Sequence, residues 1–172
     1  MTRHLVLVGL PGAGKSTVGR ILAGRLARPF VDVDEEIAAA AGMAVPEIFA
    51  RMGEPGFRSL EREAMRRIVA RQAAVIAPGG GWAAEPGALS DVRDRAIILY
   101  LVVQPEVAVA RLAGNATRPL LAVPDRLATL RRLLAEREPA YRAADLAVAA
   151  DLPDAAAVAE GALAELRRAG LL

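Results

Sequence analysis

The hydrophobic pattern of the chain alternates between short unbroken apolar runs and longer stretches with helical spacing. The apolar runs suit strands that are buried on both faces, as strands inside a parallel sheet are. We predict strands at 5–8, 30–34, 73–77, 96–103 and 146–149. We predict helices at 17–27, 34–41, 45–52, 59–71, 105–112, 124–136 and 154–168.

This alternation of strands and helices predicts an α/β fold, in which a five-stranded parallel sheet carries helices on both faces. A length of 172 residues without an internal repeat or a linker predicts one domain, 1–172. Ligands of such sheets bind beyond the carboxyl ends of the strands. A glycine-rich loop, the pair Asp32 and Asp34, and the triplet Gly79 to Gly81 all lie at the carboxyl ends of predicted strands, so we expect the site there.

Composition narrows the function classes. The chain is 54% apolar and 24% charged, with a net charge of +2 and no basic block, so we expect no nucleic-acid partner. It has no cysteine and a single histidine, His4, which excludes disulfides, thiol catalysis and a multi-histidine metal site. The apolar runs are too short to span a bilayer, and the first residues lack the order of a signal peptide. We therefore expect no membrane partner and a cytoplasmic location.

The most specific motif is the loop from Gly9 to Thr17, which fits G-x-x-x-x-G-K-[ST] and predicts a nucleoside triphosphate as ligand. Lys15 within it is the only lysine of the chain. Its compact ammonium can follow a moving phosphoryl group better than a planar guanidinium. We expect the phosphates of ATP to be bound by Gly12, Ala13, Gly14, Lys15, Ser16 and Thr17.

Other features narrow the class of phosphate-loop protein. A guanine-binding motif needs a second lysine, and no acidic residue closes the later strands as in motor ATPases, so a small-molecule kinase remains. Asp32 and Asp34 alternate on one predicted strand. We expect Asp32 to hold Mg²⁺ together with the Ser16 hydroxyl, and Asp34 to meet a substrate hydroxyl and accept its proton. The alternative for Asp34 is an acidic helix cap.

At this point the chain resembles the shikimate kinases over nearly its whole length. The resemblance rests on six blocks in order: 9–17, 30–34, 48–58, 79–81, 114–121 and 137–141. It implies a fold of the nucleoside-monophosphate-kinase type with a lid at about 113–124 and a substrate-binding segment at about 34–62. It further implies transfer of the ATP γ-phosphate to the 3-hydroxyl of shikimate, with Mg²⁺, in aromatic amino acid biosynthesis.

The resemblance also assigns residues. Asp34 would bind the shikimate hydroxyls, Arg58 and Arg137 the carboxylate, and Gly80, between Gly79 and Gly81, would contact the substrate through its backbone N–H. A small anionic polyol does need a cationic clamp at one end and a hydroxyl acceptor at the other. Arg118 in the lid would reach the transferring phosphate and act in catalysis beside Lys15 and Asp34. Arg111 would stack on adenine, with a purely structural role as the alternative.

Two features depart from the family pattern. Trp82, the only tryptophan, follows the glycine triplet and would be a core or rim residue or would reshape the pocket. Pro55-Gly56 would shift the start of the helix predicted at 59–71, which follows the proposed substrate-binding residue Arg58. A kinase of another anionic polyol such as gluconate is therefore the second hypothesis. A non-catalytic nucleotide-binding module is the third, and the intact Lys15 and Asp34 argue against it. We expect a monomer.

Overall fold

The structure is a computed structural model that describes residues 3–113 and 124–172. Residues 114–123 lie outside that range. The prediction for Arg118 and most of the predicted lid therefore fall outside the described residues.

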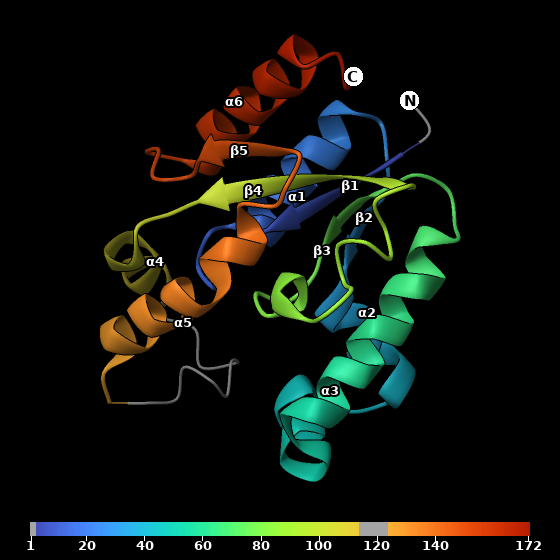
Figure 1. The fold of residues 1–172 in the computed structure, drawn as a ribbon, viewed down its shortest axis with the longest axis vertical. Helices are drawn as coiled ribbons and strands as arrows, with labels where there is room; N and C mark the ends of the chain where they lie inside the picture. Colours follow the sequence, from blue (N-terminus) through green and yellow to red (C-terminus); the bar gives the residue numbers. More distant parts are fainter. Residues whose placement is uncertain (1–2, 114–123) are drawn as a thin grey trace.

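A parallel sheet of five strands forms the centre of the molecule (Figure 1). Its strands are β1 (His4–Val8), β2 (Phe30–Asp32), β3 (Val75–Ala77), β4 (Ala96–Val102) and β5 (Leu146–Ala149). The order across the sheet is β2-β3-β1-β4-β5, and all neighbouring pairs are parallel. β1 lies in the middle, where Val6 pairs with Ile76 on one side and Ile98 on the other. All five residues of β1 are buried, as continuous apolar runs in a parallel sheet predict.

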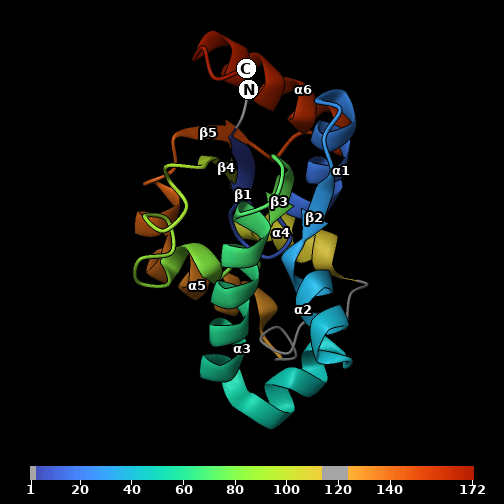
Figure 2. The same cartoon turned by 90° about the vertical axis from the view of Figure 1, so that its right-hand side faces the viewer.

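Helices cover both faces of this sheet, so the predicted α/β architecture is confirmed. The helices are α1 (Lys15–Arg25), α2 (Val33–Ala41), α3 (Val45–Val69), α4 (Pro105–Leu112), α5 (Arg126–Tyr141) and α6 (Ala155–Arg168), with a short 3₁₀ helix η1 (Trp82–Ala84). Figure 2 shows α1 and α6 on one side of the sheet and α5 on the other. α1 and α6 contact each other, and η1 contacts both α3 and α5.

The second strand is shorter than predicted. It ends at Asp32, and α2 begins at Val33, so Asp34 lies in the first turn of a helix and not on the strand. Asp32 is the N-cap of α2, and its side chain accepts a hydrogen bond from the Asp34 backbone N–H. The helix cap that the sequence suggested for Asp34 is therefore made by Asp32.

The two helices predicted at 45–52 and 59–71 form one element, α3, that is broken at Gly53. Gly53 has φ +66°, a conformation that glycine adopts readily, and it redirects the chain. Pro55 then lies in the first turn after the break, where its missing N–H removes no helical hydrogen bond. The helix start therefore shifts towards Pro55-Gly56, as their unusual composition suggested.

The helix predicted at 124–136 is also longer. α5 continues to Tyr141, although Pro139 lies within its last turn. Because Arg137 and Tyr141 are four residues apart on this helix, their side chains project from the same face. This extension brings both residues to the carboxyl edge of the sheet.

Candidate active site

The phosphate loop joins β1 to α1 and is shaped by glycines. Gly12 and Gly14 have φ values of +84° and +88°, which side chains on an L-residue disfavour. A Cβ on Gly12 would also lie 2.6 Å from the backbone oxygen of Ala108. The loop thus needs glycine at position 12 both for its conformation and for close packing against α4. Its amides precede the amino end of α1, where the helix dipole favours an anion.

Lys15, the first residue of α1, is held inside this loop. Its side chain is buried, with 5% of the residue exposed. The ammonium donates hydrogen bonds to the carbonyls of Gly9 at 2.9 Å and Leu10 at 3.1 Å. The loop therefore fixes the position of the one lysine in the chain.

Ser16 and Asp32 lie side by side, and their oxygens suit a magnesium ion. The Ser16 hydroxyl donates to Asp32 Oδ2 at 2.6 Å. Within residues 3–113 and 124–172, no three His, Cys, Asp or Glu side chains form a cluster that could hold a metal. Mg²⁺ commonly takes one or two protein oxygens together with waters and substrate phosphates, so this pair fits the ion.

A cavity of about 380 Å³ opens beside the phosphate loop. It is lined by the loop residues from Gly12 to Val18, by Arg111 and Leu112 of α4, and by Pro153, Asp154, Ala155 and Val158. Arg111 donates to the carbonyls of Ala150 at 2.7 Å and Leu152 at 3.3 Å, which ties α4 to the segment after β5. The residues at the start of α6 were not predicted as site residues, because their small apolar side chains carry no chemical signature.

A second group of polar side chains meets at the end of β3. A Cβ placed on Gly79 would lie 2.7 Å from Glu61 Oε1, 3.5 Å from Asp34 Oδ1 and 3.7 Å from Arg58 Nη1. Asp34 and Arg58, from different helices, are thus brought together at the glycine triplet. Glu61 was not predicted, because a glutamate within a charged helical run is typical of a solvent-exposed face.

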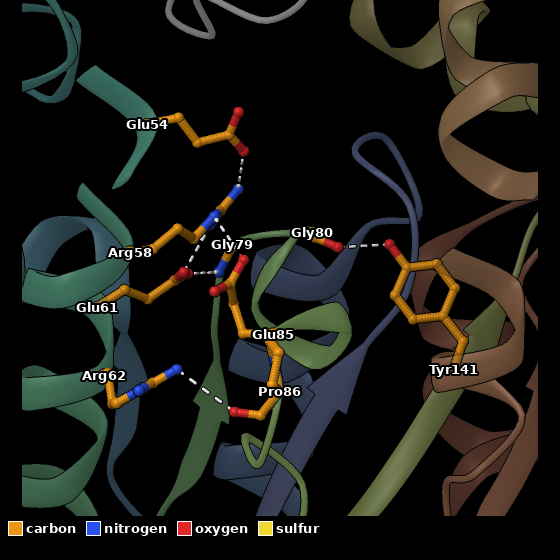
Figure 3. A network of polar contacts seen from close by, with 9 residues as sticks. All are labelled: Glu54, Arg58, Glu61, Arg62, Gly79, Gly80, Glu85, Pro86 and Tyr141. Carbon is orange, nitrogen blue, oxygen red and sulfur yellow. Dashed lines mark hydrogen bonds and ion pairs between the residues drawn. The ribbon is translucent and has the colours of Figure 1, made fainter. Parts of the chain in front are cut away.

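Arg58 is the centre of an ionic network (Figure 3). Its guanidinium donates to Glu61 Oε2 at 2.6 Å and Glu54 Oε1 at 3.1 Å, and its Nε lies 3.8 Å from a Glu85 oxygen. Only 9% of the Arg58 side chain is exposed, whereas Glu54 is nearly half exposed. The contact with Glu54 is therefore the weaker one, and the buried contact with Glu61 sets the orientation of the guanidinium.

Glu61 is buried completely and acts on the glycine triplet as well as on Arg58. Its Oε1 accepts a hydrogen bond from the Gly79 N–H at 3.0 Å. Burial raises the pKa of Glu61, the neighbouring Asp34 carboxylate adds to the rise, and Arg58 and the Gly79 N–H oppose it; the resulting pKa is about 7. A proton on this group is therefore exchanged near neutral pH.

Tyr141 approaches the same triplet from α5, and Arg137 lies one turn before it on that helix. Arg137 is a buried charge, with 8% exposed, and Tyr141 is buried completely. The Tyr141 hydroxyl donates a hydrogen bond to the Gly80 carbonyl. Burial raises the pKa of Tyr141, the charges of Arg137 and Arg58 oppose the rise, and the resulting pKa is about 12.

Trp82, which follows the triplet, is a core residue. It is 2% exposed, belongs to the hydrophobic core, and its backbone N–H donates to the Gly79 carbonyl. The core role that the sequence offered as one alternative for Trp82 is therefore correct. Tyr141 lies within the family block 137–141, but the sequence indicated no role for it; its spacing of four residues from Arg137 was the available signal.

The comparisons with known proteins agree on one family. The family model "Shikimate kinase" matches residues 11–167. A curated shikimate kinase of Nitrobacter winogradskyi is 47% identical over 88% of this chain and 71% of its own. The solved shikimate kinase of Acinetobacter baumannii, in complex with shikimate, has a TM-score of 0.95 and 35% identity, and the match covers 100% of this chain and 97% of that one.

A gluconokinase of Sinorhizobium meliloti has a similar structure, with a TM-score of 0.67 over 98% of this chain and 93% of its own. Its identity is only 20%, so this likeness concerns the fold alone. The relatives that share both sequence and structure are shikimate kinases, and they cover the phosphate loop, the glycine triplet and α5 alike. The chain belongs to the shikimate kinase family, as its motifs predicted.

Proposed function

We propose that this chain transfers the γ-phosphate of ATP to the 3-hydroxyl of shikimate at the site described above. Membership of the family makes it a shikimate kinase, an ATP-dependent transferase of aromatic amino acid biosynthesis. One observation carries the residue assignment. A phosphate loop and a cluster of an acid, a buried arginine and a glycine triplet lie at the same edge of one sheet.

The nucleotide occupies the cavity beside α1. The amides from Gly12 to Thr17 surround its β- and γ-phosphates, and Lys15 neutralises their charge. Arg111 and the start of α6 enclose the base. Ser16 and Asp32 would hold Mg²⁺, which would supply positive charge to neutralise the charge that develops on the phosphates.

Shikimate lies between α2, α3 and α5. Arg58 and Arg137 bind its carboxylate, because two guanidinium groups give a small anion both charge and direction. Asp34 accepts hydrogen bonds from the hydroxyls at the other end, and the Gly80 N–H donates to the substrate. Glu61 holds Arg58 in place for this contact.

The reaction is an in-line displacement at phosphorus. The 3-oxygen of shikimate forms a bond to the γ-phosphorus as the bond to the β,γ-bridging oxygen breaks, and the hydroxyl proton passes to Asp34. ADP leaves with the bridging oxygen. Lys15 stabilises the charge that accumulates on the phosphate oxygens, and Arg118, from the sequence alone, adds a second cation.

The test is ADP release by the purified protein with ATP and Mg²⁺, when shikimate, gluconate or quinate is offered. We expect ADP release with shikimate and shikimate 3-phosphate as the product. A preference for gluconate would favour the polyol-kinase alternative, and ADP release independent of any acceptor would contradict both. Omission of Mg²⁺ tests the metal in the same assay.

We further propose that the protein acts as a cytoplasmic monomer. Among the described residues no helix combines the length and apolarity that a bilayer span requires. Light scattering at the concentration of the assay should give a mass near the 18.0 kDa of one chain. A mass of twice that value would contradict the monomer.

A further inference from the structure

The glycine triplet after β3 is held from two sides. On one side, Glu61 of α3 accepts the Gly79 N–H; on the other, Tyr141 of α5 donates to the Gly80 carbonyl (Figure 3). Three consecutive glycines have more conformational freedom than any other tripeptide. These two anchors, from separate helices, therefore select one conformation of the loop.

The hydrogen bonds of the loop leave the backbone N–H of Gly80 open to a ligand. The Gly79 carbonyl accepts the Trp82 N–H at 3.1 Å, and the Gly81 carbonyl accepts the Ala84 N–H at 3.1 Å. Within residues 3–113 and 124–172, the Gly80 N–H donates to no protein acceptor. Because Tyr141 holds the carbonyl of the same residue, it limits the ψ rotation of Gly80 and hence the direction of the neighbouring peptides.

The Tyr141 ring is itself fixed. Its centroid lies 5.2 Å from that of Tyr100 on β4, in a tilted contact. Arg137 precedes Tyr141 by one turn of α5 and lies close enough to act on its hydroxyl. The hydroxyl therefore binds the Gly80 peptide from a helix face that also carries Arg137, and both Gly80 and Arg137 are assigned to substrate binding.

We infer that Tyr141 is a positioning residue for shikimate: its hydroxyl aligns the Gly80 N–H with the substrate and couples that amide to Arg137. This inference rests on the proposed function and adds a residue to it. Tyr141 itself does not touch the reacting atoms. Loss of the Tyr141 hydroxyl should weaken shikimate binding and leave ATP binding unchanged.

The test compares Tyr141→Phe with Tyr100→Phe in steady-state kinetics. Both changes remove one buried phenol oxygen, but no hydrogen bond joins the Tyr100 hydroxyl to the glycine triplet among the described residues. For Tyr141→Phe we expect the KM for shikimate to rise about tenfold, the value for one lost hydrogen bond, with the KM for ATP within about twofold. For Tyr100→Phe both constants should stay within about twofold of the wild type.

A rise of both KM values together in Tyr141→Phe, or a rise of neither, would overturn the inference. A purely structural role predicts that the KM for shikimate and the KM for ATP change alike. A second measurement needs no variant at position 141. The chain has two tyrosines, so in ¹³C-tyrosine-labelled protein the ring signals are assigned by Tyr100→Phe alone. Shikimate should shift the Tyr141 ring signal more than the Tyr100 signal; an unchanged Tyr141 signal overturns the inference.

The failure of this inference differs from the failure of the proposed function. Wild-type protein without shikimate-dependent ADP release would overturn both. Wild-type protein with normal turnover and a Tyr141→Phe variant without the KM split would overturn the role of Tyr141 only. The fluorescence of Trp82, the only tryptophan, reports whether the loop remains folded in each variant, because the backbone N–H of Trp82 binds the Gly79 carbonyl.

Discussion

Arg58 and Glu61 form an ion pair one turn apart on α3, with 2.6 Å between Arg58 Nη1 and Glu61 Oε2. The exposed fractions of their side chains are 9% and 0%. A buried pair of this kind adds little net stability, yet loss of one partner leaves an uncompensated charge. Because Glu61 also binds the Gly79 N–H, this pair links an arginine of the proposed substrate site to the glycine triplet.

Glu61 should make the stability of the protein depend on pH. Its pKa is about 7 in the folded protein and near 4.5 when unfolded. Between these values the folded state binds more protons, so stability falls as pH rises from about 4.5 to 7, by on the order of 3 kcal/mol at most. We expect Glu61→Gln to lack this part of the dependence when urea unfolding is measured at about pH 5 and about pH 8.

The matched control for this prediction is Glu63→Gln. Glu63 lies two residues further along α3, is mostly exposed and pairs with Arg67. Its replacement should leave the pH dependence of the free energy of unfolding close to that of the wild type. Parallel curves for all three proteins would show that Glu61 ionises as it does in the unfolded chain.

Replacement of Arg137 by alanine should chiefly weaken shikimate binding. We expect the KM for shikimate to rise at least about tenfold, since a charged hydrogen bond is lost, and the KM for ATP to change little. Arg142→Ala is the control, because Arg142 follows α5 and pairs with Glu138 at the surface. A large increase in the ATP requirement of Arg137→Ala would argue against contact with the carboxylate.

Gly81→Ala should also weaken the binding of shikimate. A Cβ on Gly81 would overlap the Arg58 guanidinium, which its carboxylate partners hold in place. We expect a higher KM for shikimate with the fold retained. Gly161→Ala is the control: it lies within α6 with no atom within 4 Å of an added Cβ, and it should stabilise the protein by about 0.5–1 kcal/mol. Thermal unfolding and kinetics of both variants provide the comparison.

Lys15→Arg should retain the positive charge and still lose most activity. The ammonium fits a buried position bounded by the Gly9 and Leu10 carbonyls, and a guanidinium is larger and has a fixed fork. We expect kcat to fall by about a hundredfold or more, the scale for loss of a preorganised charge contact. Near-normal turnover would mean that charge alone suffices at this position.

Asp34→Asn should separate chemistry from nucleotide binding. Without the carboxylate, the acceptor for the hydroxyl proton is lost, and kcat should fall by about 10²–10⁴-fold. The dissociation constant for ATP, measured by calorimetry, should remain near that of the wild type. Glu35→Gln, which alters an exposed neighbour paired with Arg20, should have little effect on either quantity. If Asp34→Asn turns over normally, another group accepts the proton.

Much of the fold could be predicted because the relevant rules are local. The apolar run of β1 indicates a strand within a few residues, and the loop from Gly12 to Ser16 carries its own ligand chemistry. The residues at which strands and helices begin and end were less predictable. The strand before Asp34 ends early because Asp32 caps α2, and α5 continues through Pro139, which alone would favour an earlier end.

The site was predicted in part, for a similar reason. Arg58 and Asp34 carry charges that suggest a polar substrate. Glu61 is no different in sequence from the exposed Glu63, because burial depends on η1 and the glycine triplet packing over it from elsewhere in the chain. Its raised pKa follows from that burial, so no pattern within α3 could predict it.

The sequence by itself determined the parallel α/β architecture, the phosphate loop around the only lysine, and the family with its activity. These depend on residue type and short-range spacing, which the printed chain displays directly. The tertiary structure alone decided that Glu61 is buried against Arg58 and that the Tyr141 hydroxyl binds the carbonyl of Gly80, 61 residues away. The burial of Glu61 and the contact of Tyr141 depend on how α3 and α5 pack against the end of the sheet, and packing between distant segments produces no periodic pattern in the sequence.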